Sequence, residues 1–510
     1  MRLEPFFQDD GDGFLRFRRV IVRDAAYSGL PYRTRRRLHG AVGVRMEHEY
    51  GGTLDEMGGL LSLHFHRAGE HEKTWRYARE AANRARGNAA FAAAADLYRR
   101  SLDAARGIDV RPELVADTWE DLGEAQARAG EVSAAVFAFS RARRLLPEDR
   151  VRGARLMHRT AWVHERVGHT AAAVRWGNRG LRTLDGLEGR AAARERAGLT
   201  TTLAAVRRQQ GRAAEAERLC RVAIAQARLA QDELLDARAS FNLDWALVDL
   251  GRGREATHSA RALEIYTRAG DTERQAAVLN NLGMFAYWEG RWQEAIDLYA
   301  RAAEASERAG DVWAAAYGDC NIGEVLADQG RLDEAEERLR RARRVWHGTE
   351  DEHGVAFTSA LLGRLAARAG RGDDAIDLLS AAIRSFDELQ TPGDAALAEA
   401  YLAEAALLGG RPDDALQRAD RQLALGNPAR ALLLRVRGGA RAALGEDDEA
   451  VTAALEEALA EARRGEERYE IALALDALLA LGHGGEEASA ERDALVEGLG
   501  VAALPAAVPG

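Results

Sequence analysis

The chain has almost no lysine and almost no cysteine. Lys73 is the only lysine among 71 lysines and arginines, and Cys220 and Cys320 are the only cysteines in 510 residues. Two cysteines cannot build a disulfide framework and lack the spacing of a metal site, so we expect both to be buried small hydrophobes. A phosphate-binding loop needs glycines before Gly-Lys-Ser/Thr, but Lys73 lies between Glu72 and Thr74. We therefore expect no ATPase site here.

Long apolar runs are also missing. No segment approaches the run of about 18 apolar residues that crosses a bilayer. The N-terminus carries Asp9, Asp10 and Asp12 and lacks the apolar core of a secretory signal. We therefore expect a cytoplasmic protein without a membrane partner. The net charge of −10 has the wrong sign for a general nucleic-acid-binding surface, which makes nucleic acid an unlikely partner, although residues 1–40 are locally positive.

What the chain does contain is a repeat. Glycine followed five residues later by alanine recurs in the pairs Gly130/Ala135, Gly168/Ala173, Gly211/Ala216, Gly251/Ala256, Gly290/Ala295, Gly330/Ala335, Gly370/Ala375, Gly410/Ala415 and Gly445/Ala450. The intervals between glycines lie between 35 and 43 residues. A fixed period of this size predicts a solenoid of helical hairpins. Seven residues before the glycine, eight of the nine units have Gly or Ala, and Asp244 is the exception.

Each repeated position has a physical role in a hairpin of two antiparallel helices. The residue seven before the turn is expected where the helices cross most closely, because only Gly or Ala allows that approach. The turn glycine supplies the left-handed conformation that ends the first helix. The alanine packs the second helix on the first, and enlarging it should cost about 1–3 kcal/mol. One hairpin cannot bury its apolar faces alone, so hairpins stack into a curved binding surface.

The unit 280–302, NNLGMFAYWEGRWQEAIDLYARA, resembles the tetratricopeptide repeat. Gly283, Gly290, Ala295, Tyr299 and Ala302 occupy the expected small and large positions, and Pro147 matches the terminal proline in the first repeat. The usual period is about 34 residues, so a period near 40 implies about one extra helical turn per hairpin. The resemblance covers roughly 114–480. It implies an all-α, right-handed superhelical solenoid of about nine hairpins that binds a protein or peptide in its concave groove.

The N-terminal segment reads as a strand and then helices, the first from about Val22. It resembles the junction between ATPase and repeats in bacterial signal-transduction ATPases with numerous domains, through Phe14, Phe17, Arg23, Asp24, Ala26, Tyr27 and Leu30. Arg19 replaces that family's usual histidine. The junction closes a winged-helix module there. Residues 60–85 and 491–510 also resemble the linker and the end of such chains, particularly those linked to a nucleotide cyclase. The resemblance implies an ATPase module upstream as a partner in cis or trans.

The organisation we expect follows from these two resemblances. Residues 1–50 form a partial winged-helix junction, 51–110 linker helices, 111–480 the repeat array, and 481–510 a C-terminal helix and tail. Thr53 to Glu56 fits a capping box that opens the linker helices.

Three asparagines are the candidate ligand-binding residues. Asn242, Asn281 and Asn321 recur at intervals of 39 and 40 residues, two before the crossing position. In tetratricopeptide proteins this position faces the concave groove, where asparagine can hold a peptide backbone. The neighbouring groove positions are Phe241, Trp245, Met284, Tyr287, Trp288, Tyr317 and Glu324. Aromatic residues are typical of interface centres. The alternative is that the asparagines bond to adjacent helices and the aromatics are core.

Two other clusters favour structural interpretations. His64 and His66 lie on different faces of a helix, and no Cys or acidic ligand completes a set with them and His71, so no metal site or other cofactor is expected. Arg33, Arg35, Arg36 and Arg37 could touch nucleic acid, but a surface for docking the upstream ATPase is favoured.

Three functions remain open. The first is a non-catalytic scaffold or sensor arm of a signalling ATPase. The second is the non-catalytic part of a cyclase or ATPase enzyme whose catalytic domains lie upstream. The third is the regulatory region of a DNA-binding transcriptional regulator.

Overall fold

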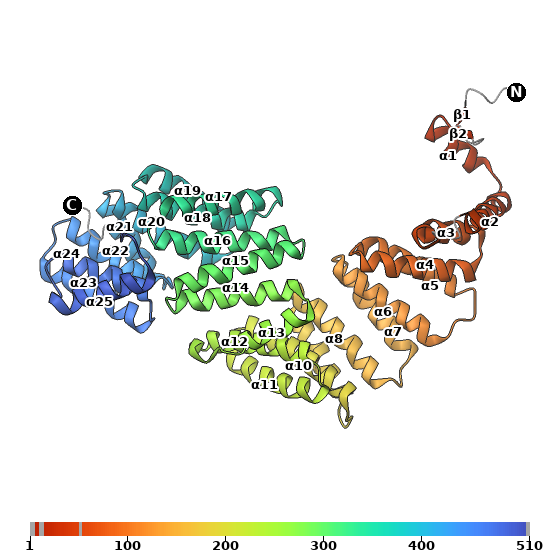
Figure 1. Cartoon of the computed structure of the whole chain (residues 1–510), viewed down its shortest axis with the longest axis horizontal. Coiled ribbons are helices and arrows are strands. Elements are labelled where there is room, and N and C mark those ends of the chain that lie inside the picture. The colour runs from red at the N-terminus through yellow and green to blue at the C-terminus, as the bar shows by residue number, and fades with distance from the viewer. Residues whose placement is uncertain (1–5, 10–14, 50–53, 506–510) are drawn as a thin grey trace. The chain divides into compact units, whose positions relative to one another are not determined.

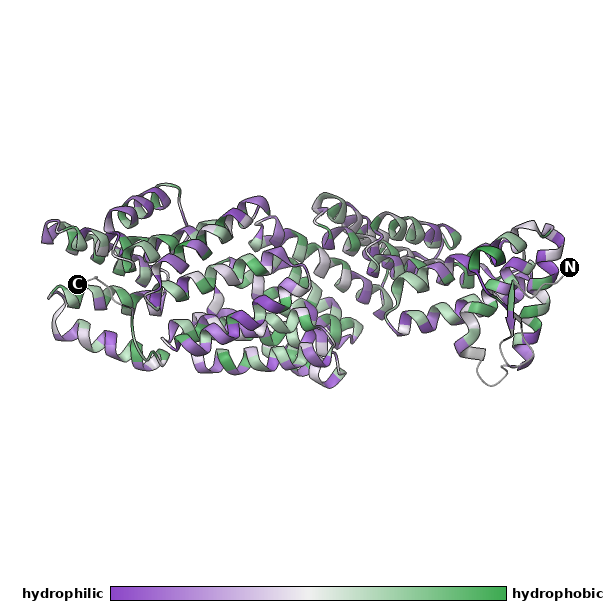
Figure 2. Ribbon diagram, turned by 90° about the horizontal axis from the view of Figure 1, so that it is seen from above, coloured by the Kyte–Doolittle hydropathy of each residue, from purple (hydrophilic) through white to green (hydrophobic). Residues whose placement is uncertain are grey.

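The protein is described by a computed structural model for residues 6–9, 15–49 and 54–505. Its contacts divide the chain into two compact units, Met1–Arg252 (unit 1) and Gly253–Gly510 (unit 2), which are described separately. Both are α-helical, apart from one short β-hairpin in unit 1 (Figure 1). Most helices show hydrophobic and hydrophilic residues along their length, as amphipathic packing requires (Figure 2). Within the described residues, no helix has the length and apolarity needed to cross a membrane.

Unit 1 begins with the β-hairpin and continues as helices. Its elements are β1 (Phe7–Asp9), β2 (Leu15–Phe17), α1 (Val20–Gly29), α2 (Tyr32–Glu49), α3 (Leu54–Ala68), α4 (His71–Gly87), α5 (Phe91–Ala105), α6 (Pro112–Arg128), α7 (Val132–Leu145), α8 (Arg150–Arg166), α9 (Thr170–Thr183), α10 (Arg190–Gln209), α11 (Ala213–Ala230) and α12 (Glu233–Asp249). The strands pair antiparallel with Phe7 opposite Phe17, whose rings lie 4.5 Å apart. Helix α1 begins at Val20, two residues before the expected start. Phe14 and Thr53 lie outside the described residues.

Unit 2 begins with a 3₁₀ turn, and its other elements within the described residues are α-helices. Its elements are η1 (Gly253–Glu255), α13 (Ser259–Ala269), α14 (Thr272–Trp288), α15 (Trp292–Arg308), α16 (Val312–Asp328), α17 (Leu332–Gly348), α18 (Glu352–Arg368), α19 (Gly372–Glu388), α20 (Pro392–Leu408), α21 (Pro412–Ala424), α22 (Arg430–Ala443), α23 (Asp448–Arg464), α24 (Arg468–Ala480) and α25 (Gly485–Leu499). Helices α14 to α20 are 17 residues long. Two such helices with short turns make a period of 40, which confirms the lengthened tetratricopeptide-like hairpin.

Seven of the nine predicted alanines are buried. Ala135, Ala173, Ala216, Ala295, Ala335, Ala375 and Ala415 are at most 1% exposed. The other two predictions were wrong. Ala256 lies outside any helix, because α13 begins only at Ser259 and is shortened to 11 residues. Helix α23 begins three residues after Gly445 instead of two, so Val451 takes the buried place and Ala450 is half-buried.

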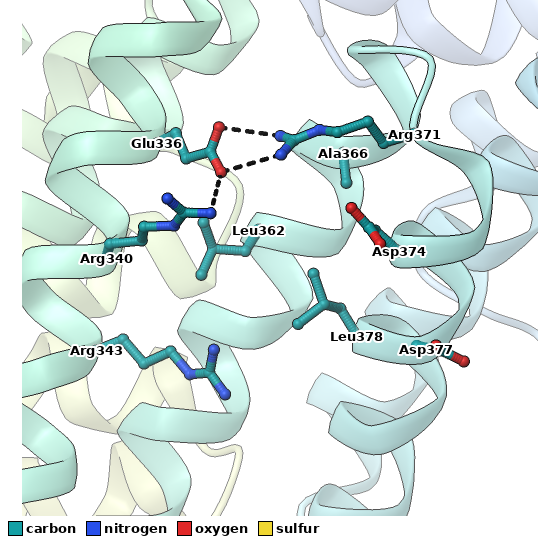
Figure 3. A pocket seen from close by; sticks show the side chains of 9 residues that line it. All are labelled: Glu336, Arg340, Arg343, Leu362, Ala366, Arg371, Asp374, Asp377 and Leu378. Atoms are coloured by element: carbon teal, nitrogen blue, oxygen red, sulfur yellow. Dashed lines mark hydrogen bonds and ion pairs between the residues drawn. The ribbon is translucent and has the colours of Figure 1, made fainter.

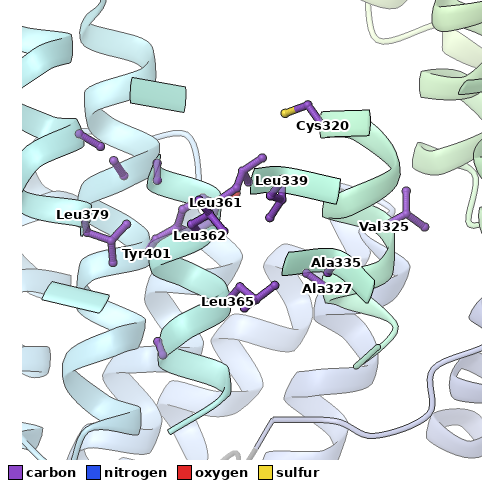
Figure 4. Close-up of a cluster of buried hydrophobic side chains, with 14 of the residues drawn as sticks. Cys320, Val325, Ala327, Ala335, Leu339, Leu361, Leu362, Leu365, Leu379 and Tyr401 are labelled. Carbon is purple, nitrogen blue, oxygen red and sulfur yellow. The ribbon is translucent and has the colours of Figure 1, made fainter. Parts of the chain in front are cut away.

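The crossing glycines are required by large side chains on the second helices. A Cβ added at Gly283 would lie 2.7 Å from the Tyr299 ring, and one at Gly363 would lie 2.7 Å from Leu379 Cγ. Figure 4 shows Leu379 within the buried cluster around α16 to α20. The hairpins with a crossing glycine therefore close through that glycine on the first helix and a large residue on the second helix, which in these two lies four places after the buried alanine.

Replacing Gly363 with Ala should lower the free energy of unfolding by about 1 kcal/mol, because the clash with Leu379 outweighs the gain in helix propensity. Gly393, also in a helix, is the control, since a Cβ there would meet nothing within 4 Å. Gly393→Ala should be neutral or slightly stabilising. Denaturant unfolding of both variants checks this prediction, and equal stability of the two would contradict it.

The hairpin α4/α5 follows the repeat pattern although its turn lacks glycine. Ala89 adopts the left-handed conformation with φ of 57°, and Ala94 and Ala82 occupy the buried positions five after and seven before it. A search for Gly-x-x-x-x-Ala misses this hairpin because Ala89 replaces the glycine. Repeat-like packing therefore begins inside the segment that we expected to be linker helices.

The C-terminal segment of unit 2 packs against the first hairpins of the same unit. Gln329 Nε2 donates to the carbonyl oxygen of Leu499 at 3.1 Å, and Ala502 N donates to the carbonyl oxygen of Gln329 at 2.8 Å. The ring of Tyr469 in α24 lies 5.3 Å from that of Trp292. The last hairpin of unit 2 therefore closes onto its early repeats.

Candidate binding site

The first helices of the hairpins in unit 2 are buried on two sides. Helix α18 buries twelve of its 17 residues, whereas its partner α19 buries four. One side of α18 packs on α19, and the other, which we call the inner face, lies toward the other first helices. Because apolar residues do not fill all of that inner face, charged side chains meet there.

Six charged residues on the inner faces form one cluster, which we call the central ion cluster. Its members are Asp328 of α16, Arg364 and Arg368 of α18, Glu404 of α20, Arg435 of α22 and Glu470 of α24. Arg368 Nη1 lies 2.6 Å from Asp328 Oδ1, Arg435 Nη2 lies 2.8 Å from Glu404 Oε1, and Arg435 Nε lies 2.8 Å from Glu470 Oε2. Tyr287 of α14 donates to Asp328 at 2.7 Å. First helices from α14 to α24 thus contribute to one buried network.

The cluster changes the pKa of its acids in opposite directions. Burial alone would raise the pKa of Glu404, but Arg368, Arg435 and Arg364 outweigh it and hold that pKa at about 2. Glu324, half-buried one turn before Asp328, has its pKa raised to about 7, first by burial and then by Asp328. Arg364 and Arg368 oppose that rise without cancelling it. Three arginines therefore balance Asp328, Glu404 and Glu470, and Glu324 is the carboxyl left over.

Two of the three candidate asparagines lie in unit 2, on adjacent first helices. Asn281 is 7% exposed, and its amide Nδ2 has no hydrogen-bond partner within the described residues. Asn321 is half-buried and its Nδ2 donates to Asn280 Oδ1 at 2.8 Å. Asn242, in α12 of unit 1, is also half-buried. Buried amides are usually satisfied, so the free donor of Asn281 is the notable feature.

The structure distributes the candidate aromatic residues over different surfaces. Tyr287 contacts the central ion cluster, whereas Tyr317 packs edge-on against Trp346 of its own hairpin, at 4.9 Å between rings. Trp288 is 48% exposed and Met284 is half-buried. In unit 1, Phe241 and Trp245 are half-buried, and the Arg208 guanidinium lies 5.1 Å from the Trp245 ring. Of the groove residues predicted in unit 2, Tyr287 and Glu324 therefore both lie near Asp328 of the central ion cluster, whereas Tyr317 packs inside its own hairpin.

Unit 1 has an open polar groove on three successive first helices. It has a volume of about 370 Å³ and is lined by Arg79, Asn83 and Arg86 of α4, Asp117, Glu120, Asp121 and Glu124 of α6, and Arg159 of α8. Arg86 lies 2.6 Å from Asp121, and Arg159 lies 3.2 Å from Glu124. The acidic face of α6 is therefore held between arginines from the helices on either side.

The N-terminal arginines partly serve the local fold. Arg36 Nε donates to the carbonyl oxygen of Ala68 at 2.9 Å, at the C-terminus of α3. The Arg35 guanidinium lies 5.5 Å from the Tyr27 ring. Arg33 and Arg37 are exposed.

The histidines of the N-terminal segment do not gather into a metal site. Within the described residues, no group of three His, Cys, Asp or Glu could hold a metal ion. His64 Nδ1 lies 3.1 Å from His39 Nδ1, and His66 and His71 are exposed.

The central ion cluster could have been found partly from the sequence. Glu324 directly follows the crossing residue, and the same position 40 and 80 residues later holds Arg364 and Glu404. Residues in one register on successive first helices lie side by side, so a Glu, Arg, Glu series predicts an ion ladder. Arg435 does not share that register, because the residue directly after the crossing Gly438 is Gly439 and Arg435 lies one helical turn before it.

The fold is that of an all-helical, tetratricopeptide-like solenoid. A family model described as "Tetratricopeptide repeat" matches residues 314–388, which hold the whole hairpin α18/α19 and all but the first two residues of α16/α17. The comparison with curated proteins found no match.

Solved structures similar to the chain are also helical. One is a signal transduction ATPase with numerous domains and a tetratricopeptide repeat sensor from Pyrococcus horikoshii, at 15% identity over 68% of this chain and 54% of that one, with a TM-score of 0.49. Another is aspartyl phosphate phosphatase F from Bacillus subtilis, at 12% identity over 70% and 94%, with a TM-score of 0.44. A third is a Rap protein complexed with competence and sporulation factor, at 15% identity over 78% and 99%, with a TM-score of 0.41. At such identities the similarity concerns fold alone.

Proposed function

We propose that the chain is a non-catalytic, cytoplasmic interaction scaffold that binds an extended segment of a protein or peptide on the inner faces of its first helices. In this proposal it serves as the sensor arm of a multidomain bacterial signalling ATPase. Arg33, Arg35, Arg36 and Arg37 form the surface that docks the ATPase module, in cis or in trans.

The observation that carries the proposal is the buried Asn281 Nδ2, which has no hydrogen-bond partner among the residues that the structure describes. A buried Nδ2 without a partner loses the free energy of its hydration, which costs about 1–3 kcal/mol unless a ligand accepts the hydrogen bond. A peptide carbonyl is such an acceptor, and asparagine offers both donor and acceptor to a peptide backbone. The polar groove of unit 1 supports the same use of first helices, since it leaves side chains of α4, α6 and α8 accessible.

Replacing Asn281 and Asn321 of unit 2 together with alanine should weaken partner binding about tenfold, because two hydrogen bonds of about 0.5–1.5 kcal/mol each are lost. Asn242→Ala, in unit 1, is measured as a separate variant. The free energy of unfolding should change little. The Asn281 substitution removes a donor without a partner among the described residues, and the Asn321 substitution removes one hydrogen bond to Asn280. The partner is first identified by affinity capture with the full chain, and its affinity is then measured by calorimetry.

Gln293→Ala, on the exposed side of α15, is the matched control and should leave affinity unchanged. Undiminished affinity of these variants would remove the asparagines from the site. Absence of any captured protein or peptide would argue against the scaffold function itself.

A further inference from the structure

Helix α17 carries charged residues where the neighbouring second helices carry uncharged ones. The residues 40 positions earlier in α15 and 40 positions later in α19 are uncharged at three places. They are Ile296 and Ile376 for Glu336, Ala300 and Ser380 for Arg340, and Ala303 and Ile383 for Arg343. The α15 and α19 residues Ile296, Ala300, Ile376 and Ile383 pack against the hydrophobic core. An Ile-to-Glu or Ile-to-Arg difference at such a position gives up apolar contact area. Helix α17 therefore departs from the packing rule of this array.

The departure leaves a groove between α17 and α19, on the side of the hairpins away from the central ion cluster. It has a volume of about 260 Å³. Leu362 and Ala366 of α18 and Leu378 of α19 give it apolar surface, as Figure 3 shows. Glu336, Arg340 and Arg343 line it from α17, and Arg371, Asp374 and Asp377 line it from α19 (Figure 3). A second hollow of about 350 Å³ adjoins the same helix and is lined by Arg340, Arg343, Arg344 and His347.

The cations of α17 divide into satisfied and available groups. Arg338 and Arg341 both bind Asp319, at 2.8 and 2.5 Å. Arg340 lies 2.6 Å from Glu336, which Arg371 also binds at 3.0 Å. Arg343, Arg344 and His347 form no ion pair among the residues that the structure describes, and they follow one another along one side of the helix.

The charges of Glu336, Arg340 and Arg371 in the groove are satisfied by one another. What remains is apolar surface between the helices, the Arg343 guanidinium on the α17 side and the carboxylates of Asp374 and Asp377 on the α19 side. Arginine guanidinium groups match carboxylates in two-point hydrogen bonds. The carboxylates of Asp374 and Asp377 repel a continuous phosphate backbone, which disfavours nucleic acid. An α-helix can present leucine to the floor and glutamate to one wall at the same time, which is how amphipathic helices dock in grooves.

We propose that the groove between α17 and α19 docks an acidic amphipathic helix of another protein. Its apolar side chains contact Leu362 and Leu378, and its carboxylates bind Arg343, Arg344 and His347. This surface lies on the second helices and does not depend on the function proposed for the inner faces.

The test uses the full chain and a fluorescein-labelled Leu/Glu amphipathic helix of about four turns. We expect binding by fluorescence anisotropy that weakens as salt increases. The double variant R343A/R344A should bind about tenfold more weakly. The control is R384A, because Arg384 is exposed and occupies the place of Arg344 one repeat later, and its affinity should equal that of the wild type.

A second variant separates binding from folding. The triple variant E336I/R340A/R343I gives α17 residues that occupy the same positions in α15 or α19, so it should fill the groove, raise the melting temperature and abolish peptide binding. No binding at low salt, equal binding by R343A/R344A, or equal binding of a peptide with lysine in place of glutamate overturns the proposal. Tighter binding of duplex DNA than of the peptide overturns it in favour of a nucleic-acid surface.

Discussion

Replacing Glu404 with glutamine should lower the free energy of unfolding of unit 2 by about 3–5 kcal/mol. Glu404 is 2% exposed, and its side chain lies 2.8 Å from Arg435 and 3.5 Å from Arg364. Removing one member of a buried ion pair leaves the other charge without compensation in a medium that solvates it poorly. The amide keeps the shape of the side chain and deletes only its charge, so the loss measures electrostatics and not a cavity. Urea unfolding followed by circular dichroism measures it.

The control for this variant is Glu399→Gln in the same helix. Glu399 lies 3.6 Å from Arg418 with 27% of its side chain exposed, and pairs near the surface contribute about 0–1 kcal/mol. A Glu404→Gln loss no larger than that of Glu399→Gln would show that water reaches the central ion cluster.

The low pKa of Glu404 gives a second measurement. Its contribution is present above about pH 4.5 and is lost as pH falls toward 2, and Glu404→Gln should lack this acid-dependent loss.

The repeat could be predicted because its cause is local. A left-handed turn and a close helix crossing each require a small residue at a fixed number of positions along the chain. Gly323, Gly330 and Ala335 therefore indicate the hairpin from the sequence alone. Prediction failed where the chain changed the length of a turn. The one extra residue before α23 moved Val451 into the place expected for Ala450.

The inner surface was harder to predict, because the first helices are buried on two sides. Helical spacing shows which residues share a face, but not whether that face meets the second helix or the other first helices. Tyr287 and Tyr317 illustrate this difficulty, since one contacts Asp328 and the other contacts Trp346. The hydrogen bonds of Gln329 with Leu499 and Ala502 join residues about 170 positions apart, and no local pattern indicates them.

Replacing Glu324 with glutamine should stabilise unit 2 at pH 8 by about 2–3 kcal/mol and flatten its dependence on pH. The pKa of Glu324 is raised to about 7 in the folded chain, mainly by burial and also by Asp328, from about 4.5 when unfolded. Between these values the folded state holds a proton that the unfolded chain has released. The free energy of unfolding therefore falls as pH rises through this window, by about 1.4 kcal/mol per pH unit at most. Glutamine is neutral throughout and avoids that loss.

The comparison needs unfolding free energies at pH 4.5, 6 and 8. The wild type and Glu324→Gln should agree near pH 4.5, where the carboxyl is protonated in the fold, and should diverge above it. Glu337→Gln, an exposed carboxyl of α17, is the control and should follow the wild type at every pH. If Glu324→Gln were instead less stable than the wild type at pH 8, the carboxylate of Glu324 would be an ionised partner of Arg364 and Arg368. The three arginines of the central ion cluster would then be shared among four acids, and the interior of unit 2 would carry a net negative charge.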